Sequence, residues 1–544
     1  MLTYTSRPKR PEPTHEYPWL LLLLAFCWLW PGVFSHDLWT PSEPNMMLAI
    51  DDAAQRGAWL PTVFGAAYFD VSPLYVQTAA WFKMLLPPSA AHTNSAARYV
   101  RSKLFTSLGL LGSGMAGYRF LGRHHGRSVV LILIGSVGIL PIAHFLGAYS
   151  PVFAGVGLAM WGFSIAQRQV MFSAILVALG TMLLAQSLGL LAALAMLLVA
   201  SLLPFSPHWR NQRYTVALVA MWAISSPLLA VYPIALAIVE PAAFAVYWQQ
   251  HIFGSFGGIN QVQAAFSLHY YMQHLLWFAF PALPLAIWTR TRQSFRPTPA
   301  SVLMATWLAV FGGFLLLNPE QHQDLLVLLL PPLALSGAAQ LDNLRRGMAA
   351  FLNWFGIALF GCAAVFLWIG FVAMNYGFPA KLAERAAYFS PYYTRDLDIM
   401  PILVALLFTP MWLIAITRKR IRGRQAVTNW AAGTTLVWAL LMTLFLPWID
   451  AAKSHRPVIQ QLIQAVPDVA HANCLYIDPR DKTARLAWQQ YGTGAYTIQN
   501  ASCRYTLAQY NPRNEVAPAG NIVWQGKRPR SKTELFVLIH NGGE

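Results

Sequence analysis

Charged residues are scarce in this sequence, and long stretches of it contain none. Asp, Glu, Lys and Arg make up 11% of the 544 residues, whereas a soluble globular domain carries roughly 25%. Hydrophobic residues make up 56% of the chain. This balance excludes an ordinary soluble protein and predicts a polytopic helical membrane protein.

Acidic residues are fewer than basic ones, 21 against 38, which leaves a net charge of +17. Such a charge can indicate nucleic-acid binding. However, 19 of the 38 basic residues lie in the N-terminal segment and in short loops between apolar runs. The positive-inside rule places such loops in the cytoplasm. Topology therefore accounts for this part of the charge, and we expect no nucleic-acid partner.

The apolar runs predict about thirteen transmembrane helices, because every second loop between them is basic. The predicted spans are 18–35, 104–121, 128–146, 152–167, 170–186, 188–204, 214–238, 270–289, 299–317, 325–340, 350–374, 399–417 and 428–447. Thirteen spans that start inside place the N-terminus in the cytoplasm and the C-terminus outside. We expect the inner membrane of a bacterium, with the C-terminal part in the periplasm.

Acidic residues are rare on the side of the membrane where the basic loops lie. Only Glu12, Glu16 and Asp342 fall on the predicted cytoplasmic side, twelve acids fall in or beside the outer segments, and six lie in the tail. Acids gathered at one membrane face indicate a polar site that opens on that face.

Three predicted outer segments are long, and we call them the first (36–103), second (240–268) and third (375–398) long segments. Helical spacing in the first predicts helices over 43–57 and 76–86. Residues 1–450 are interpreted as the transmembrane domain and residues 451–544 as an external α/β domain. That tail has strand-like runs at 475–477, 496–498, 522–524 and 535–539 and a helical run at 454–466.

Cysteine is also rare, with four residues in all. Cys27 and Cys362 lie in apolar runs, where a free thiol packs as a small hydrophobic residue. Cys474 and Cys503 lie in the polar tail, which the topology places in an oxidising compartment. We expect these two to form a disulfide.

The most informative motifs follow the first apolar run, in three blocks. They read Asp37-Leu38-Trp39-Thr40-Pro41-Ser42-Glu43-Pro44, Arg56-Gly57-Ala58-Trp59-Leu60-Pro61 and Tyr68-Phe69-Asp70-Val71-Ser72-Pro73-Leu74-Tyr75. Their order and spacing resemble the first external loop of bacterial membrane glycosyltransferases of the GT-C class. The pattern is most similar to aminoarabinose transferases for lipid A and to protein mannosyltransferase-like enzymes.

This resemblance implies an all-α, GT-C-like fold with a small external domain. It also implies a donor in which a polyprenyl phosphate carries the sugar, and a lipid or glycan acceptor at the outer face. The chain would then be an integral membrane glycosyltransferase of the hexosyl or pentosyl type, with membrane lipids around it. A soluble sugar-nucleotide enzyme would instead need a nucleotide-binding glycine motif, and we find none.

The chain departs from the family pattern at its acids. The resemblance places the family's catalytic Asp at Ser42, and its Glu-Lys pair at Asp70-Val71. Glu43, Asp70 and Asp37 are therefore the candidates for general-base or charge-stabilising roles, and the other two acids of the first long segment, Asp51 and Asp52, are held in reserve.

Substrate-binding candidates are the aromatic and cationic residues of the same segment, together with the polar residue at the lost acid position. They are Trp39, Ser42, Tyr68, Tyr75, Lys83 and Arg98. The aromatic rings suit a sugar face, but they equally suit a membrane-interface belt. The cations suit a donor phosphate, but anionic lipid headgroups would attract them as well.

A divalent metal is a possible cofactor, since some aminoarabinose transferases use a Glu and two His. By position the ligands would be Asp70, His269 (or His251) and His322. The alternative is that these histidines only make hydrogen bonds near the interface.

Two other functions stay open from the sequence. One is a degenerate relative that binds a lipid-linked sugar without turning it over. The other is a transporter or flippase of lipid-linked sugars, which more often shows repeats and charges within broken helices. We find no internal repeat, and the acids cluster in loops, so the sequence favours the transferase.

Overall fold

The structure is a computed structural model that describes most of the chain. It describes residues 18–33, 36–57, 59–85, 91–292, 297–395, 398–417, 423–471, 474–499 and 503–541. Within these ranges, the side chains of 18, 42, 82–85, 91–102, 292 and 471 lie outside the description.

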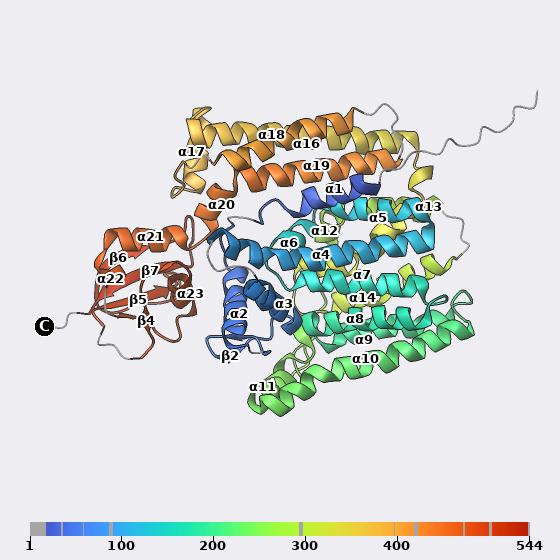
Figure 1. Ribbon diagram of the computed structural model, residues 1–544, viewed down its shortest axis with the longest axis horizontal. Coiled ribbons are helices and arrows are strands. Elements are labelled where there is room, and N and C mark those ends of the chain that lie inside the picture. The colour runs from blue at the N-terminus through green and yellow to red at the C-terminus, as the bar shows by residue number, and fades with distance from the viewer. Residues whose placement is uncertain are drawn as a thin grey trace, which may run out of the picture.

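A bundle of long helices forms the main body (Figure 1). Its helices are α1 (Pro18–Leu29), α4 (Ala91–Leu121), α5 (Arg123–Gly135), α6 (Ile139–His144), α7 (Tyr149–Ile165), α8 (Val170–Leu188), α9 (Leu190–Leu202), α10 (Gln212–Val239), α12 (Leu268–Phe278), α13 (Ala282–Arg292), α14 (Pro299–Leu317), α15 (Leu330–Ala339), α16 (Arg346–Tyr376), α18 (Ile399–Ile416) and α19 (Gly423–Leu444). Each predicted span contains helix, although the helix of the 18–35 span ends at Leu29 and residues 34–35 lie outside the description. Of the described helices, 6 are long and apolar enough to cross a membrane alone.

Three predicted spans are each divided into two helical pieces. The 128–146 span breaks between α5 and α6, and the 270–289 span breaks between α12 and α13. The 325–340 span begins as a 3-10 helix, Gln323–Leu328, and continues as α15. These interruptions correct the prediction of continuous helices, and two of them meet, because the Gly138 N–H donates to the Phe278 carbonyl at 3.0 Å.

Small residues let α4 and α7 approach closely. A Cβ built on Gly157 of α7 would lie 2.5 Å from the carbonyl oxygen of Gly109 on α4, and one built on Gly112 would lie 2.4 Å from the Gly157 carbonyl. No real Cβ fits at such distances. Small residues at helix contacts are the usual means of tight packing in membrane proteins.

The first long segment folds against the end of this bundle. It contains α2 (Ser42–Arg56), a hairpin of β1 (Thr62–Val63) and β2 (Ala66–Ala67), and α3 (Pro73–Leu85). The two predicted helices are thus present. Their apolar faces form a second core with the neighbouring ends of α4, α7 and α8, centred on Met47, Ile50 and Val76.

The other two long segments lie at the same end of the bundle. The second contains α11 (Pro241–Val246), a π-helical turn at Tyr247–His251 and a 3-10 turn at Gly254–Phe256, and the third contains α17 (Ala380–Phe389). We call this end, where the C-terminal domain also lies, the domain end. Figure 1 shows α2, α3, α11 and α17 gathered there, next to the C-terminal domain in red.

The opposite end carries the basic loops. Arg424 and His125 both contact Asp342 there, the imidazole at 3.9 Å. In the neighbouring loops, the Trp209 indole donates to the Pro299 carbonyl at 3.0 Å. The charge sorting in the sequence therefore corresponds to two physical ends of one molecule.

The C-terminal domain is a five-stranded mixed sheet with helices on one face. Its elements are α21 (Arg456–Ala465), α22 (Asp468–His471), β3 (Leu475–Tyr476), α23 (Lys482–Tyr491), β4 (Tyr496–Thr497), β5 (Tyr505–Tyr510), β6 (Asn521–Gly526) and β7 (Leu535–His540), and the strand order is β4-β3-β5-β7-β6. Trp488, Leu507 and Leu538 are fully buried in its core. Cys474 and Cys503 form the expected disulfide, with their Cα atoms 5.4 Å apart.

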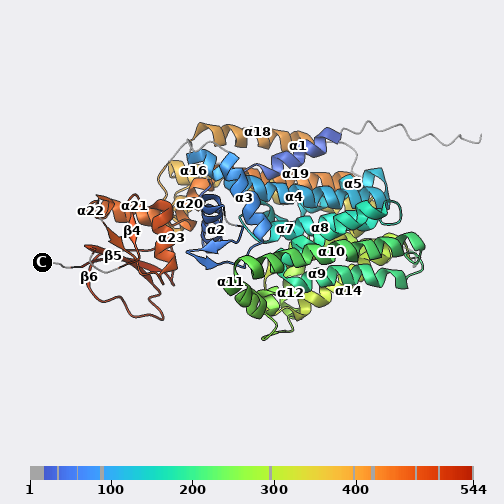
Figure 2. The ribbon, with the colours of Figure 1, turned by 60° about the horizontal axis from the view of Figure 1, so that its bottom comes forward.

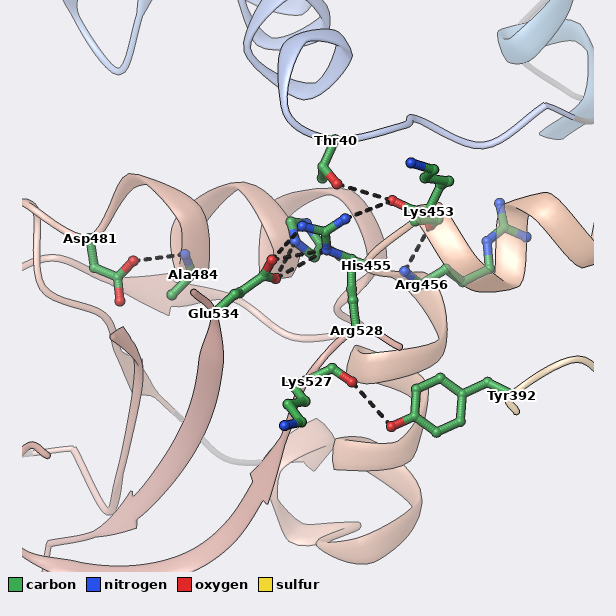
Figure 3. A network of polar contacts seen from close by, with 11 residues as sticks. Thr40, Tyr392, Lys453, His455, Arg456, Asp481, Ala484, Lys527, Arg528 and Glu534 are labelled. Atoms are coloured by element: carbon green, nitrogen blue, oxygen red, sulfur yellow. Dashed lines mark hydrogen bonds and ion pairs between the residues drawn. The ribbon is translucent and has the colours of Figure 1, made fainter. Parts of the chain in front are cut away.

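Polar contacts join this domain to the bundle through α20 (Leu446–Lys453). The Lys453 carbonyl accepts from the Thr40 hydroxyl at 3.1 Å and from the Arg528 guanidinium at 3.4 Å (Figure 3). Tyr392 of the third long segment donates to the Lys527 carbonyl at 3.1 Å. Figure 2 shows, from a second side, α2 lying between the bundle and the domain.

Candidate active site

Glu43 ties two loops together at the start of α2. Its carboxylate is buried, with 2% of the residue exposed. One oxygen accepts from the Trp39 N–H at 2.7 Å, and the other accepts from the Leu146 N–H at 2.9 Å. Leu146 belongs to the loop before α7, so Glu43 fixes the first long segment to the bundle. Both oxygens of this carboxylate are therefore bonded to backbone amides.

A buried lysine lies behind Glu43. Lys103 of α4 is 7% exposed, and its ammonium donates to the Ala143 carbonyl at 3.0 Å. Burial disfavours its charged form, and the charge of Glu43 opposes this effect. Buried cations require a compensating charge, because their desolvation is otherwise costly. Lys103 therefore contributes to the packing and hydrogen bonding of this buried region.

Asp37 and Trp39 connect the first long segment to α20 and the C-terminal domain. Asp37 is 5% exposed and pairs with Arg456, and the Trp39 indole donates to Asp450 at 2.7 Å. Burial, and then the nearby charge of Asp37, raise the pKa of the Asp450 carboxyl well above its usual range. The Leu38 N–H donates to the Tyr491 hydroxyl at 3.3 Å. Asp37 is thus held inside a junction.

Asp70 differs from the other two predicted catalytic acids because it is exposed. It follows the β1–β2 hairpin and precedes α3, whose start is fixed by a hydrogen bond from Ser72 to Gln186 at 3.1 Å. The neighbouring Phe69 ring contacts the His251 ring at a centroid distance of 5.1 Å. Asp70 therefore stands where the first and second long segments meet.

The predicted substrate-binding residues separate in the structure. Tyr68 is half-buried, and burial together with the charge of Asp70 raises its pKa to about 12. Tyr75 is fully buried against Phe105, with centroids 5.7 Å apart. This corrects the expectation that Tyr75 stacks on a sugar, since its ring belongs to the core. The side chains of Ser42, Lys83 and Arg98 lie outside the described residues, although their backbones begin or continue helices α2, α3 and α4.

The metal set predicted from the sequence is not assembled. His269 is exposed and contacts Gln273 at 2.8 Å, whereas His322 lies against Tyr149. Among the residues that the structure describes, no group of three or more His, Cys, Asp or Glu side chains is arranged to hold a metal ion. Asp70, His269 and His322 therefore do not form one site here, and no metal role is derived from them.

Sequence reasoning named His322 only as a metal ligand and missed the polar cluster around Asp324, which lies in the first turn of the 3-10 helix after α14. The ring of His322 stacks on Tyr149 at 5.1 Å and an interplanar angle of 11°. Its Nδ1 lies 3.7 Å from an Asp324 oxygen, and the other Asp324 oxygen is buried without a hydrogen-bond partner. Burial raises the pKa of this carboxyl, although His322 opposes the shift. The only sequence signal was the dense run of polar residues from Asn318 to Asp324.

The C-terminal domain has a polar cavity of about 770 Å³, on the sheet face opposite its helices. Tyr476, Thr506 and Ile539 contribute to its wall. None of the predicted site residues described by the structure lines it, so it is separate from the first long segment.

Comparison with known proteins identifies the fold. No protein-family model and no curated protein matches the sequence. The structure of ArnT from Cupriavidus metallidurans in the apo state superposes with a TM-score of 0.64 at 15% identity, over 95% of this chain and 97% of that one. The chain has the ArnT fold. ArnT bound to undecaprenyl phosphate superposes over the same shares, with a TM-score of 0.60 and 15% identity.

The ArnT fold is the GT-C fold that the motifs of the first long segment predict. The match to ArnT includes the small C-terminal sheet domain as well as the helices, since nearly all of both chains is covered. At 15% identity the likeness to ArnT establishes the architecture, while the chemistry has to be argued from the residues at the domain end.

Proposed function

We propose that this protein is a membrane glycosyltransferase that moves a sugar from a polyprenyl-phosphate donor to a lipid or glycan acceptor. The observation that carries the proposal is the fold. Almost the whole chain superposes on ArnT, and one of the ArnT structures holds undecaprenyl phosphate. The first-segment motifs, found independently in the sequence, lie at the domain end of that fold.

The charge pattern supports an orientation for this reaction. Basic loops gather at the end opposite the C-terminal domain, so the domain end should face the periplasm across the inner membrane. A lipid-linked donor would present its sugar at that surface. The acids Asp70, Glu240 and Glu320 are exposed there.

The acids of the first long segment then have different roles. Glu43 and Asp37 hold the segment in place through buried contacts. Asp70 is the predicted catalytic acid that a substrate can reach, and we assign it to contact with the polar groups of the transferred sugar or the acceptor. Trp39 and Tyr68 shape the same segment, and the buried Trp39–Asp450 hydrogen bond keeps it against α20.

Mass spectrometry of a deletion strain tests the proposed function. Envelope glycans and lipid A from the source bacterium should lose one mass increment, equal to a sugar residue, when the gene is deleted. Re-expression of the wild-type protein should restore it. An unchanged set of glycans and lipids would contradict the transferase and favour the degenerate binding protein or the transporter.

Substitution of Asp70 tests its assignment. Asp70→Asn should lower restoration of the sugar increment at least tenfold at equal protein level, because the exposed carboxylate is lost without disturbing buried contacts. Glu384→Gln is the control, since Glu384 is an exposed acid of α17 at the same end of the molecule. Full restoration by Asp70→Asn would remove Asp70 from the site.

A further inference from the structure

The Asp324 cluster has three features that the packing of the bundle does not explain. The Ser150 hydroxyl, the Asn318 amide nitrogen and one Asp324 oxygen are all buried without a hydrogen-bond partner. Ser150 and Asn318 are each only 1% exposed. Buried polar atoms are almost always hydrogen-bonded, because each one left unpaired costs about 1–3 kcal/mol. Several such atoms in one region indicate a site at which a polar group of a ligand can bind.

These atoms come from three neighbouring places in the bundle: the start of α7, the end of α14 and the 3-10 helix Gln323–Leu328. Ser150 lies in the first turn of α7, directly after Tyr149, and Tyr149 stacks on His322 of the 318–324 loop. Asn318 caps the end of α14 and begins that loop. The cluster is therefore built where the start of α7 meets the end of α14.

The loop that carries Asp324 is rigidly held. The Tyr271 hydroxyl donates to the Glu320 carbonyl at 3.1 Å, and the Gln321 amide donates to the Ser267 hydroxyl at 3.2 Å. The Asn318 side-chain oxygen accepts from the Glu320 N–H at 2.9 Å. Catalytic groups need supports of this kind, because small displacements cost large factors in rate.

The cluster also adjoins the first long segment. Leu146, which Glu43 binds, lies three residues before Tyr149 in the chain. The Asp324 side chain retains 18% exposure and the His322 side chain 43%, so the cluster opens at the domain end. An acceptor at the domain end can therefore reach the Asp324 carboxyl from solvent.

We propose that Asp324 is the general base of the transfer, oriented by His322, on which Tyr149 stacks. This proposal rests on the proposed function. The acceptor hydroxyl gives its proton to the Asp324 carboxylate, and its oxygen forms a bond to the anomeric carbon of the sugar. The bond from that carbon to the donor phosphate breaks, and its electron pair leaves with the polyprenyl phosphate. The acceptor class is therefore an alcohol.

The carboxyl suits this role better than the exposed Asp70. Burial raises the pKa of the Asp324 carboxyl, which increases its proton affinity. His322 lies 3.7 Å from one Asp324 oxygen, and the Tyr149 ring stacks on the His322 ring. Ser150 and Asn318 supply a hydroxyl and an amide that can bond the acceptor's other polar groups.

Complementation of the deletion strain tests the proposal. Asp324→Asn should lower the restored sugar increment at least 100-fold at equal protein level, in line with general-base contributions of roughly 10²–10⁴. Asp324→Glu should recover part of it. Glu384→Gln is the control, because Glu384 is an exposed acid of α17 at the same end of the molecule, and it should behave as wild type.

A binding measurement separates catalysis from folding. Purified Asp324→Asn should bind undecaprenyl phosphate with wild-type affinity and melt within a few degrees of wild type. Loss of binding or of folding in this variant, or wild-type restoration of the increment, would overturn the proposal. If wild type restores no increment at all, the proposed function fails instead, and the two failures are distinguishable.

Discussion

Single residues at the domain end show how burial changes the meaning of a carboxylate. Glu43, Asp70 and Asp324 are all acids of segments at this end, yet they lie in three different environments. Glu43 is closed in by two backbone amides, Asp70 is solvated, and Asp324 is buried with one oxygen unpartnered. Burial and partners decide the role of each, and neither is visible in a motif.

Glu43→Gln should destabilise the protein more than it changes the chemistry. The substitution removes the charge that faces the buried Lys103, which should lower the free energy of unfolding by about 3 kcal/mol. Thermal melting of the purified protein measures this. Activity per folded molecule should stay within about tenfold of wild type, because the group does not face a substrate. A loss of 100-fold or more with an unchanged melting temperature would show that Glu43 takes part in catalysis.

Glu534 should make the C-terminal domain sensitive to acid. Burial disfavours its charged form, but hydrogen bonds from His455 at 2.6 Å and from Arg528 outweigh this and lower its pKa to about 2. Since this folded-state pKa lies below the ordinary value of 4.5, the stabilisation is complete above about pH 4.5. It should be lost as pH falls towards 2, with a total of about 3 kcal/mol.

Pepsin cleavage measures this loss, because the protease works in the same pH range. Cleavage of the wild-type chain within 456–541 should accelerate between pH 4.5 and 2, relative to a soluble peptide standard. Glu534→Gln should be cleaved quickly throughout, without the pH-dependent step. Identical profiles for the two proteins would show that the network drawn in Figure 3 does not govern the stability of the domain.

At the scale of elements, close helix contacts depend on glycines at particular positions. Gly157→Ala should lower the free energy of unfolding by about 2–3 kcal/mol, because its Cβ would lie 2.5 Å from a backbone oxygen of α4 and the helices must separate. Gly312→Ala in α14 has no atom within 4 Å of its Cβ, and it should be neutral or slightly stabilising. Melting temperatures in one detergent compare the two. Equal melting temperatures would contradict the α4–α7 contact.

Breaks within the predicted spans also belong to this scale. Apolar content predicts that 128–146 is helical, but it does not show where the helix stops. The residue after α5, Ser136, is extended, and a Cβ on Gly138 would lie 2.2 Å from the Phe278 ring. The interruption is thus set by a neighbour more than a hundred residues away in the chain. Hydrophobic periodicity depends on residues close together in the chain, so it does not predict such a contact.

At the scale of the whole molecule, the two ends should lie on opposite sides of the membrane. A periplasm-active reporter fused after Glu544 should be active, and one fused at Gly423 should be inactive, because Gly423 lies beside the basic loops. A cytoplasm-active reporter should give the reverse pattern. Cytoplasmic activity at the C-terminus would contradict the thirteen-span topology and the orientation used for the proposed function.

The sequence by itself determined the helical bundle, the GT-C-like fold and the small C-terminal sheet domain. These follow from properties that are local or periodic: apolar runs as long as a bilayer, basic residues in alternate loops, and motifs at fixed spacing. Four of the five strands of the tail sheet were predicted for the same reason. β5 was missed, although Tyr505 and Leu507 alternate with less buried residues along it.

Tertiary structure alone decided which polar residues stand together and which are enclosed. Tyr75, predicted to face a sugar, is buried because α3 turns that side towards Phe105. Asp324 became a candidate only when its loop was seen beside Tyr149, more than 170 residues away in the chain. Contacts between distant segments set burial, and burial sets proton affinity and access, so the chemistry of this site could not be read from the sequence.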